Sequence, residues 1–225
     1  IEWTINIENI KSNPLYSYKK YKILKKFLKE NPIDIQSVTC DFFMQKPFFK
    51  KEKNFSSIKI LKKVILFTKK LGIKYIIIPL VDNSKIENKY QEENLINVMK
   101  NLSKLLGKSQ KFLFEIDYSP TQTLKFIKRF NSKFGINYDT GNSACLGHDF
   151  QKEKLYFKYV YNIHLKDRLY KGKTVRLGKG DFDFKRFFNY LKKINYSNNL
   201  ILQTARSFND IKEMEININY IKKFL

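Results

Sequence analysis

Four side chains of the types that bind metal ions stand near the ends of short apolar runs. Glu115 lies in "KFLFEID", Asp139 ends "FGINYD", His164 lies in "YNIHLKD" and Gln203 lies in "NLILQT". The gaps between them are 24, 25 and 39 residues (139 − 115, 164 − 139, 203 − 164). Two carboxylates, an imidazole and an amide oxygen suit a divalent cation such as Mn²⁺, Mg²⁺, Co²⁺ or Zn²⁺. The pattern therefore predicts a metal site, provided that the ends of these runs meet in space.

Each of these residues also has a purely structural interpretation. Glu115 could be a strand-end charge facing solvent, Asp139 could cap a turn at Gly141, and His164 could be a hydrogen-bonded core histidine. For any one residue taken alone, the structural interpretation is favoured, because single motif matches carry high false-positive rates. Their recurrence at matching ends of consecutive runs favours a shared site.

Short apolar runs alternate along the chain with amphipathic segments. The runs have the length of β-strands, and the segments between them repeat apolar residues at steps of three and four, which is typical of helices. The predicted strands cover 1–5, 33–40, 73–81, 111–117, 134–139, 161–167 and 199–204, and the predicted helices include 21–30, 58–72, 93–107, 121–130, 184–194 and 218–225.

Capping residues support these boundaries. Ser119 and Pro120 precede one helical segment as an N-cap and a first-turn proline, Asp181 or Asp183 caps another, and Gly72 follows a third. Strands that alternate with helices indicate parallel strands joined by crossover helices.

About seven βα units fit into residues 1–225, with no linker that would divide the chain. We therefore expect one α/β domain, a (β/α)8 TIM barrel that lacks its first βα unit. An open doubly wound sheet ranks lower, because no Gly-rich phosphate loop follows any strand. In a barrel, the carboxyl ends of successive strands open at one mouth, where the four metal-ligand candidates would converge.

The net charge of +23 raises the question of nucleic-acid binding. Of 44 basic residues, five are arginine, and the lysines are spread along nearly every predicted helix. Readers of bases and phosphates favour the bidentate fork of arginine, so dispersed lysine predicts a solvated surface and no specific nucleic-acid partner.

The cellular environment is inferred from what the sequence contains. Cys40 and Cys145 form no CxxC pair, and free thiols of a reducing compartment are expected. No secretory signal or membrane span is recognised, which predicts a cytoplasmic protein with no membrane partner. The chain begins at Ile1 inside a predicted strand, which suggests a missing N-terminal segment. Assembly into a homo-oligomer stays open.

Three segments of the sequence carry a resemblance to a known family. They are "YDTGNSACLGHD" (138–149), "IHLKDRLYKGKTVRLGKGDFDFKRFF" (163–188) and "YSNNLILQTAR" (196–206). The chain resembles the xylose isomerase-like barrel superfamily over nearly its whole length, specifically the sugar (phosphate) isomerase/epimerase branch. A histidine strand, a basic loop and an LGxG turn leading into a helix make the middle segment the most specific.

The resemblance implies one divalent metal ion at the mouth of the barrel. The family holds it with a Glu on strand 5, an Asp on strand 6, a His on strand 7 and usually a Glu on strand 8. Glu115, Asp139 and His164 match the first three of these, and Gln203 departs from the fourth.

The implied reaction is isomerisation or epimerisation of a small sugar or sugar phosphate through an enediolate. The metal would polarise the carbonyl, and Glu115 would move the proton as the catalytic carboxylate. Because an amide cannot serve as a second base, Gln203 makes a dehydratase or other lyase a close alternative. A metal-dependent abasic-site nuclease and a non-catalytic sugar-binding barrel are the remaining alternatives, and the presence of two histidines argues against the nuclease.

A basic loop follows the predicted histidine strand. It predicts a site for a substrate phosphate or carboxylate, since barrel phosphate sites often use the last two loops. Gly178 and Gly180 would allow a ligand to approach the backbone closely, and Asp167 could orient an arginine or transfer a proton. The predicted substrate-binding residues are Asn142, Arg168, Lys173, Arg176 and Arg206.

Overall fold

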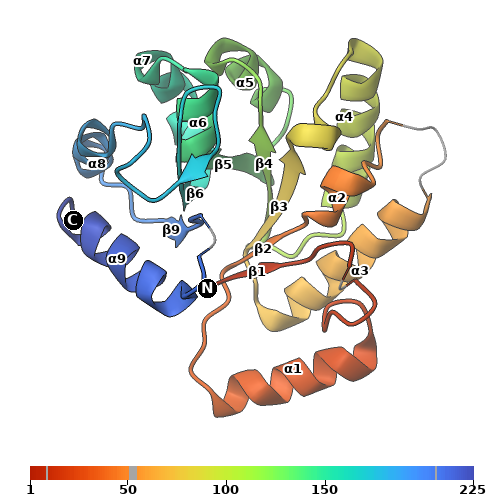
Figure 1. The fold of residues 1–225 in the computed structure, drawn as a ribbon. Coiled ribbons are helices and arrows are strands. Elements are labelled where there is room, and N and C mark those ends of the chain that lie inside the picture. Colours follow the sequence, from red (N-terminus) through yellow and green to blue (C-terminus); the bar gives the residue numbers. More distant parts are fainter. Residues whose placement is uncertain (9, 51–54, 206) are drawn as a thin grey trace. The chain divides into compact units, whose positions relative to one another are not determined.

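A parallel sheet of seven strands organises the chain in the computed structural model, which describes residues 1–8, 10–50, 55–205 and 207–225. The strands pair in chain order, β1-β2-β3-β4-β5-β6-β9 (Figure 1). This order, with helices between the strands, confirms the α/β TIM-barrel fold, with seven strands of the sheet among the described residues. The strands are β1 (Glu2–Thr4), β2 (Ser37–Thr39), β3 (Tyr75–Leu80), β4 (Lys111–Ile116), β5 (Phe134–Asp139), β6 (Val160–Leu165) and β9 (Asn199–Leu202).

The chain divides into two compact units, and the first comprises residues 1–117 and 125–136. Its core is apolar: every residue of β3 is buried, and the side chains of Phe42, Phe43, Phe48 and Phe49 are each at most 2 % exposed. Its helical segments are α1 (Tyr18–Glu30), α2 (Phe42–Gln45), α3 (Phe55–Leu71), the 3-10 turn η1 (Asp82–Ser84) and α4 (Lys89–Ser103).

The second unit comprises residues 118–124 and 137–225, so that β5 and α5 (Pro120–Ile127) contribute residues to both units. It contains the short antiparallel hairpin of β7 (Asp167–Arg168) and β8 (Thr174–Val175), which the sequence did not predict. Its remaining elements are α6 (Thr140–Leu146), α7 (Phe150–Glu153), η2 (Lys154–Tyr159), α8 (Phe184–Lys193) and α9 (Asp210–Lys222).

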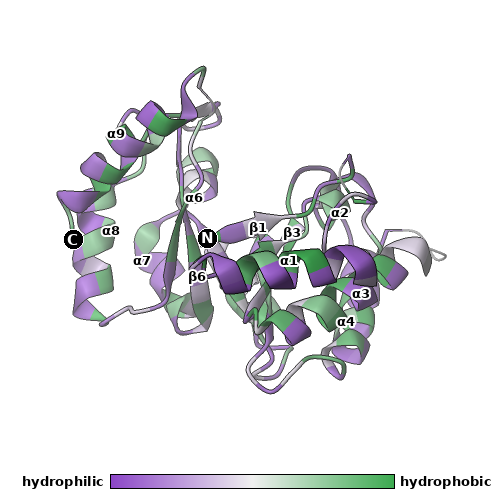
Figure 2. Ribbon diagram, turned by 90° about the horizontal axis from the view of Figure 1, so that it is seen from below, coloured by the Kyte–Doolittle hydropathy of each residue, from purple (hydrophilic) through white to green (hydrophobic). Residues whose placement is uncertain are grey.

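Capping and amphipathicity explain where the helices form. The Asp183 side chain accepts from the Arg186 N–H and caps α8, as the sequence predicted, and Gly72 follows α3 with a left-handed φ of 76°. The Ser119 N–H donates to Oε1 of Gln122, one half of a capping box at α5. Helices α1 and α8 combine hydrophilic and hydrophobic residues along their length (Figure 2).

Two expectations about the environment can be compared with the structure. Cys40 and Cys145 are free thiols, as expected. Among the described residues, no helix combines the length and the apolar character that crossing a membrane would require.

Candidate metal centre

Asp139 ends β5, and the two oxygens of its carboxylate make different contacts. Its Oδ1 atom accepts a 2.8 Å hydrogen bond from the Asn142 N–H and thereby caps α6. Its Oδ2 atom lies 4.0 Å from Nδ1 of His164 and 3.8 Å from Nζ of Lys166. The side chain is 1 % exposed, so its charge is held almost entirely by protein groups.

His164 is fully buried on β6 and is oriented by two asparagines. Nδ2 of Asn162 donates to Oδ1 of Asn137 over 2.7 Å, and Nδ2 of Asn137 lies 3.1 Å from Nδ1 of His164. These two contacts link Asn162, Asn137 and the imidazole in one chain of buried polar side chains, which restricts the orientation of the ring.

Strand periodicity places these polar groups together. Side chains alternate between the two faces of a strand, so Asn137 shares a face of β5 with Asp139, and Asn162 shares a face of β6 with His164. All four side chains belong to residues that are at most 5 % exposed. The sequence predicts the ligand candidates but not the role of the asparagines, although their spacing of two residues from Asp139 and His164 is a usable signal.

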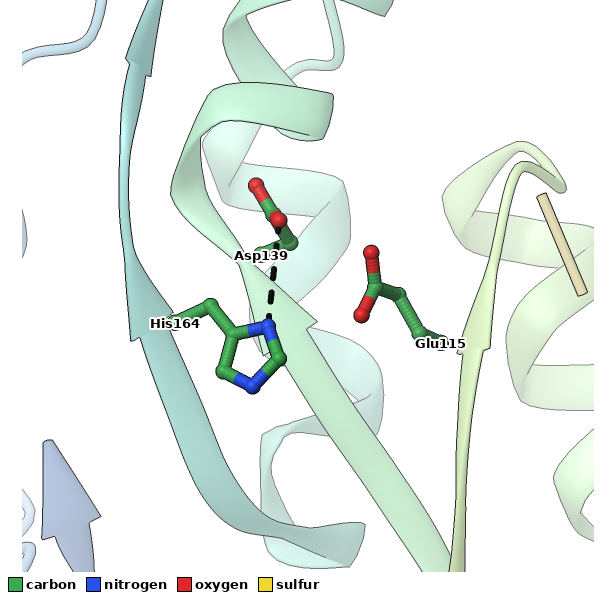
Figure 3. A group of neighbouring side chains, drawn as sticks. All are labelled: Glu115, Asp139 and His164. Carbon is green, nitrogen blue, oxygen red and sulfur yellow. Dashed lines mark ion pairs between the residues drawn. The ribbon is translucent and has the colours of Figure 1, made fainter. Parts of the chain in front are cut away.

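Glu115 lies on β4 and completes the candidate group. One ligand atom from each of Glu115, Asp139 and His164 lies within 4.8 Å of the others (Figure 3). Two ligands on opposite sides of an ion, each about 2.0–2.3 Å away, are about 4–4.6 Å apart. A separation of up to 4.8 Å is close to this range, and the assignment of these three residues as ligands stays a prediction.

Gln203 directly follows β9 and contacts a lysine that the sequence analysis overlooked. Its Oε1 accepts from Nζ of Lys166 over 3.4 Å, while its backbone N–H donates to the Leu165 carbonyl. The Lys166 ammonium therefore lies between the Gln203 amide and the Asp139 carboxylate. Lys166 stands two residues after His164, and side chains at this spacing share one face of an extended chain. That spacing was the available signal for the lysine.

The predicted substrate-binding residues have different surroundings. Nη1 of Arg168 donates to Oδ1 of Asn142 over 3.2 Å, which brings two of them together. Lys173 is exposed, and Arg176 makes a bidentate ion pair with Glu213 of α9, with both distances 2.7 Å. Arg206 lies outside the described residues.

Asp167 organises the loop that follows β8. Its carboxylate accepts from the backbone N–H groups of Gly178, Gly180 and Phe182 at 2.9, 2.9 and 3.3 Å. A Cβ at Gly180 would lie 2.2 Å from Oδ1 of Asp167, so this glycine admits the carboxylate, where the sequence analysis had expected a ligand. Burial raises the pKa of Asp167, and the three N–H donors partly oppose that rise.

Gly141 is required by close packing. The sequence suggested a sharp turn at this residue, but it lies inside α6, and a Cβ there would stand 2.7 Å from Cγ of Lys166 and 3.1 Å from Cγ of Arg168. The stems of the two cationic side chains therefore cross the surface of this glycine.

A buried carboxylate outside the metal centre supports α6 and α7. Glu153 accepts from the Tyr138 hydroxyl at 2.8 Å and the Ser143 hydroxyl at 2.9 Å, and Nδ1 of His148 lies 3.4 Å away. Burial and Glu153 raise the pKa of Tyr138 well above its ordinary value, which keeps the phenol a neutral donor. His148 is thus a loop residue that pairs with Glu153.

Comparison with known proteins gives a family match and several matches of fold. The family described as "Xylose isomerase-like TIM barrel" matches residues 4–224. No curated protein matches the chain in sequence.

Three solved structures illustrate the likeness of fold. A xylose isomerase domain protein from Planctomyces limnophilus is 16 % identical, with a TM-score of 0.81 over 99 % of this chain and 87 % of that one. An IOLI protein with a zinc atom is 16 % identical, with a TM-score of 0.77 over 100 % and 89 %. D-allulose 3-epimerase from Methylomonas sp. is 14 % identical, with a TM-score of 0.75 over 100 % and 86 %.

Proposed function

Since the chain belongs to the xylose isomerase-like TIM barrel family, we propose that it is a divalent-metal-dependent isomerase or epimerase of a small sugar or sugar phosphate. The observation that carries the proposal is the buried group of Glu115, Asp139 and His164, whose ligand atoms lie within 4.8 Å of one another. The family also supports an enzyme of this kind, since similarly folded proteins include 3-keto-D-glucoside 4-epimerase and D-psicose 3-epimerase.

The residues fit a divalent ion by their chemistry. Two carboxylates and an imidazole offer oxygen and nitrogen ligands, which suit Mn²⁺, Mg²⁺, Co²⁺ or Zn²⁺. Buried carboxylates need a compensating positive charge, which such an ion supplies. Among the proteins of similar fold, one is described with zinc and another with magnesium.

In the proposed reaction, separate residues transfer the proton and bind the substrate. A bound divalent ion would polarise a substrate carbonyl and its neighbouring hydroxyl. The Glu115 carboxylate takes the proton from the carbon that bears the hydroxyl and returns it to the former carbonyl carbon of the enediolate, while the hydroxyl proton passes to the former carbonyl oxygen, which completes an isomerisation. Asn142 and Arg168, which contact each other, bind substrate oxygens.

Gln203 sets a limit on this chemistry. An amide has no usable proton affinity near neutral pH, so proton transfer proceeds through Glu115 alone. One-sided transfer suits isomerisation between neighbouring carbons, or elimination by a lyase, better than epimerisation. Coordination by Gln203 and substrate contacts by Lys173, Arg176 and Arg206 stay predictions.

The metal centre is tested by calorimetric titration of chelator-treated protein with Mn²⁺. We expect one site per chain, with affinity reduced by about tenfold or more in Asp139→Asn and His164→Ala, since each variant removes a direct ligand. His148→Ala is the matched control, because it removes the other histidine and should retain the affinity. Equal affinity in all four proteins would place the ion elsewhere.

The reaction is tested with a panel of aldoses, ketoses and their phosphates in deuterated water. A competent substrate should exchange its α-proton, and Glu115→Gln should abolish the exchange while Glu215→Gln, an exposed acid on α9, preserves it. Gln203→Glu should add epimerase activity by restoring a second carboxylate. Exchange that persists in Glu115→Gln would assign the base to another residue.

A further inference from the structure

Lys166 is held beside the candidate metal centre by its own backbone. It follows β6, its N–H donates to Oγ1 of Thr140 over 2.8 Å, and its carbonyl accepts from the same hydroxyl. Thr140 is fully buried and also donates to the carbonyl of His164. The lysine therefore starts from a fixed point two residues beyond a metal-ligand candidate.

The path of the side chain is equally constrained. Its Cγ and Cδ atoms lie 2.7 and 3.0 Å from the position of a Cβ at Gly141, so any larger residue there would displace them. The ammonium consequently reaches the centre, 3.8 Å from Oδ2 of Asp139 and 3.4 Å from Oε1 of Gln203.

The ammonium keeps a donor for a further partner. It has three N–H donors, and among the described residues the hydrogen bond to Gln203 uses one of them, while Asp139 at 3.8 Å makes an ion pair beyond hydrogen-bond distance. The Lys166 side chain is 22 % exposed, whereas that of Asp139 is 1 % exposed, so the cation lies at the accessible side of the centre.

Charge decides which ligand suits this arrangement. Gln203 orients the ammonium without neutralising it, whereas a glutamate at the same place would form an ion pair with it. The stem of Arg168 also borders Gly141, but its guanidinium donates to the Gly172 carbonyl and to Oδ1 of Asn142. The ammonium of Lys166 is therefore the cation that would attract an oxyanion at this centre.

We propose that Lys166, oriented by Gln203, is a specificity-determining residue that binds an anionic oxygen of the substrate, a carboxylate or a phosphate. This inference rests on the proposed function for its substrate, a sugar derivative. It assigns Gln203 a role in orienting Lys166, and it makes an acidic or phosphorylated sugar the preferred class over a neutral one.

The test measures binding of inorganic phosphate, gluconate and neutral sorbitol to the full chain by calorimetry, in chelator-treated and Mg²⁺-loaded protein. Phosphate and gluconate distinguish the two anion sources. We expect one of them to bind more tightly than sorbitol, and Lys166→Met and Gln203→Glu each to weaken that binding by about tenfold or more. Lys166→Arg should retain most of the affinity, and Lys179→Met, which removes an exposed lysine of the following loop, should leave it unchanged.

The outcomes separate this inference from the proposed function. Equal anion affinity in wild type and Lys166→Met, or no preference of the wild type for either anion over sorbitol, would overturn the inference even if Mn²⁺ binds as proposed. Lys166-dependent anion binding by a chain that fails to bind Mn²⁺ would support the inference and overturn the metal-dependent reaction. Circular dichroism melting of each variant excludes misfolding as the cause of a loss.

Discussion

Strands β3 and β6 have the same length and nearly the same burial, but opposite chemistry. All six residues of β3, "YIIIPL", are buried, and both of its faces are dominated by apolar side chains. In β6, "VYNIHL", the fully buried residues include Asn162 and His164. A buried polar group is costly unless it is hydrogen-bonded, and β6 meets this condition through Asn137 of β5. Burial therefore serves packing in β3, and in β6 it accompanies hydrogen bonds that orient a ligand candidate.

The largest effect should come from truncating the apolar core of the first unit. Phe43 is fully buried, with its ring centroid 4.0 Å from that of Phe42 and 4.8 Å from that of Phe48. Phe43→Ala should lower the free energy of unfolding by about 3–5 kcal/mol, because a large cavity remains. Urea denaturation measures this, with Phe43→Leu as the milder control. A loss below that of the leucine variant would show that this core is loosely packed.

The next largest loss of stability should come from replacing Asp167, a buried polar residue of the second unit. Asp167→Ala leaves three backbone N–H groups without their charged acceptor, so we expect a loss of about 3 kcal/mol and faster proteolysis within residues 176–182. Asp167→Asn, which keeps one acceptor oxygen, should lie between this variant and the wild type. Wild-type stability in Asp167→Ala would contradict the loop-organising role.

Replacing one hydrogen-bonded asparagine by leucine in each unit tests whether polar groups of the two units have different roles. Asn137→Leu removes the hydrogen-bond partner of His164 and should lower Mn²⁺ affinity by about tenfold or more. Asn94→Leu removes a 2.8 Å hydrogen bond to the Phe49 carbonyl and should cost about 1 kcal/mol of stability without changing metal affinity. If both variants bind Mn²⁺ equally well, the hydrogen bonds that link Asn162, Asn137 and His164 do not orient the imidazole for metal binding.

The smallest effect concerns the ion pair between Arg176 and Glu213. Arg176 lowers the pKa of Glu213 from its ordinary value of 4.5, so the pair stabilises the fold above that pH and the contribution is lost as pH falls through the lowered value. Glu213→Gln should therefore melt slightly below wild type at neutral pH, with the difference fading as the pH falls through the lowered pKa of Glu213 and in high salt. A difference that grows in acid would contradict this sign.

Much of the fold could be predicted because it is encoded locally. The apolar run 134–139 coincides with β5, and the run 73–81 contains β3. The predicted strand 33–40 shrinks to Ser37–Thr39, since apolar residues alone do not show where pairing partners end. The hairpin of β7 and β8 escaped prediction because its strands are two residues long and carry no periodicity.

The candidate site divides in the same way. Glu115, Asp139 and His164 were predicted from their places at the ends of apolar runs, and one ligand atom of each lies within 4.8 Å of the others. The roles of Lys166 and Asp167 escaped prediction, because they depend on partners eleven to thirty-seven residues away that are adjacent only in the folded chain. Type and spacing identify ligands, whereas the groups that orient them emerge from three-dimensional contacts.

The double use of the Asp139 carboxylate has a consequence for stiffness. Turning the carboxylate to move Oδ2 would also pull Oδ1 away from the Asn142 N–H and uncap α6. The carboxylate therefore has little rotational freedom left to lose when a ligand arrives, since its orientation is already fixed when the helix folds. Glutamate, one methylene longer, would move both oxygens away from these positions, so the helix cap favours the shorter acid here as much as any ion does.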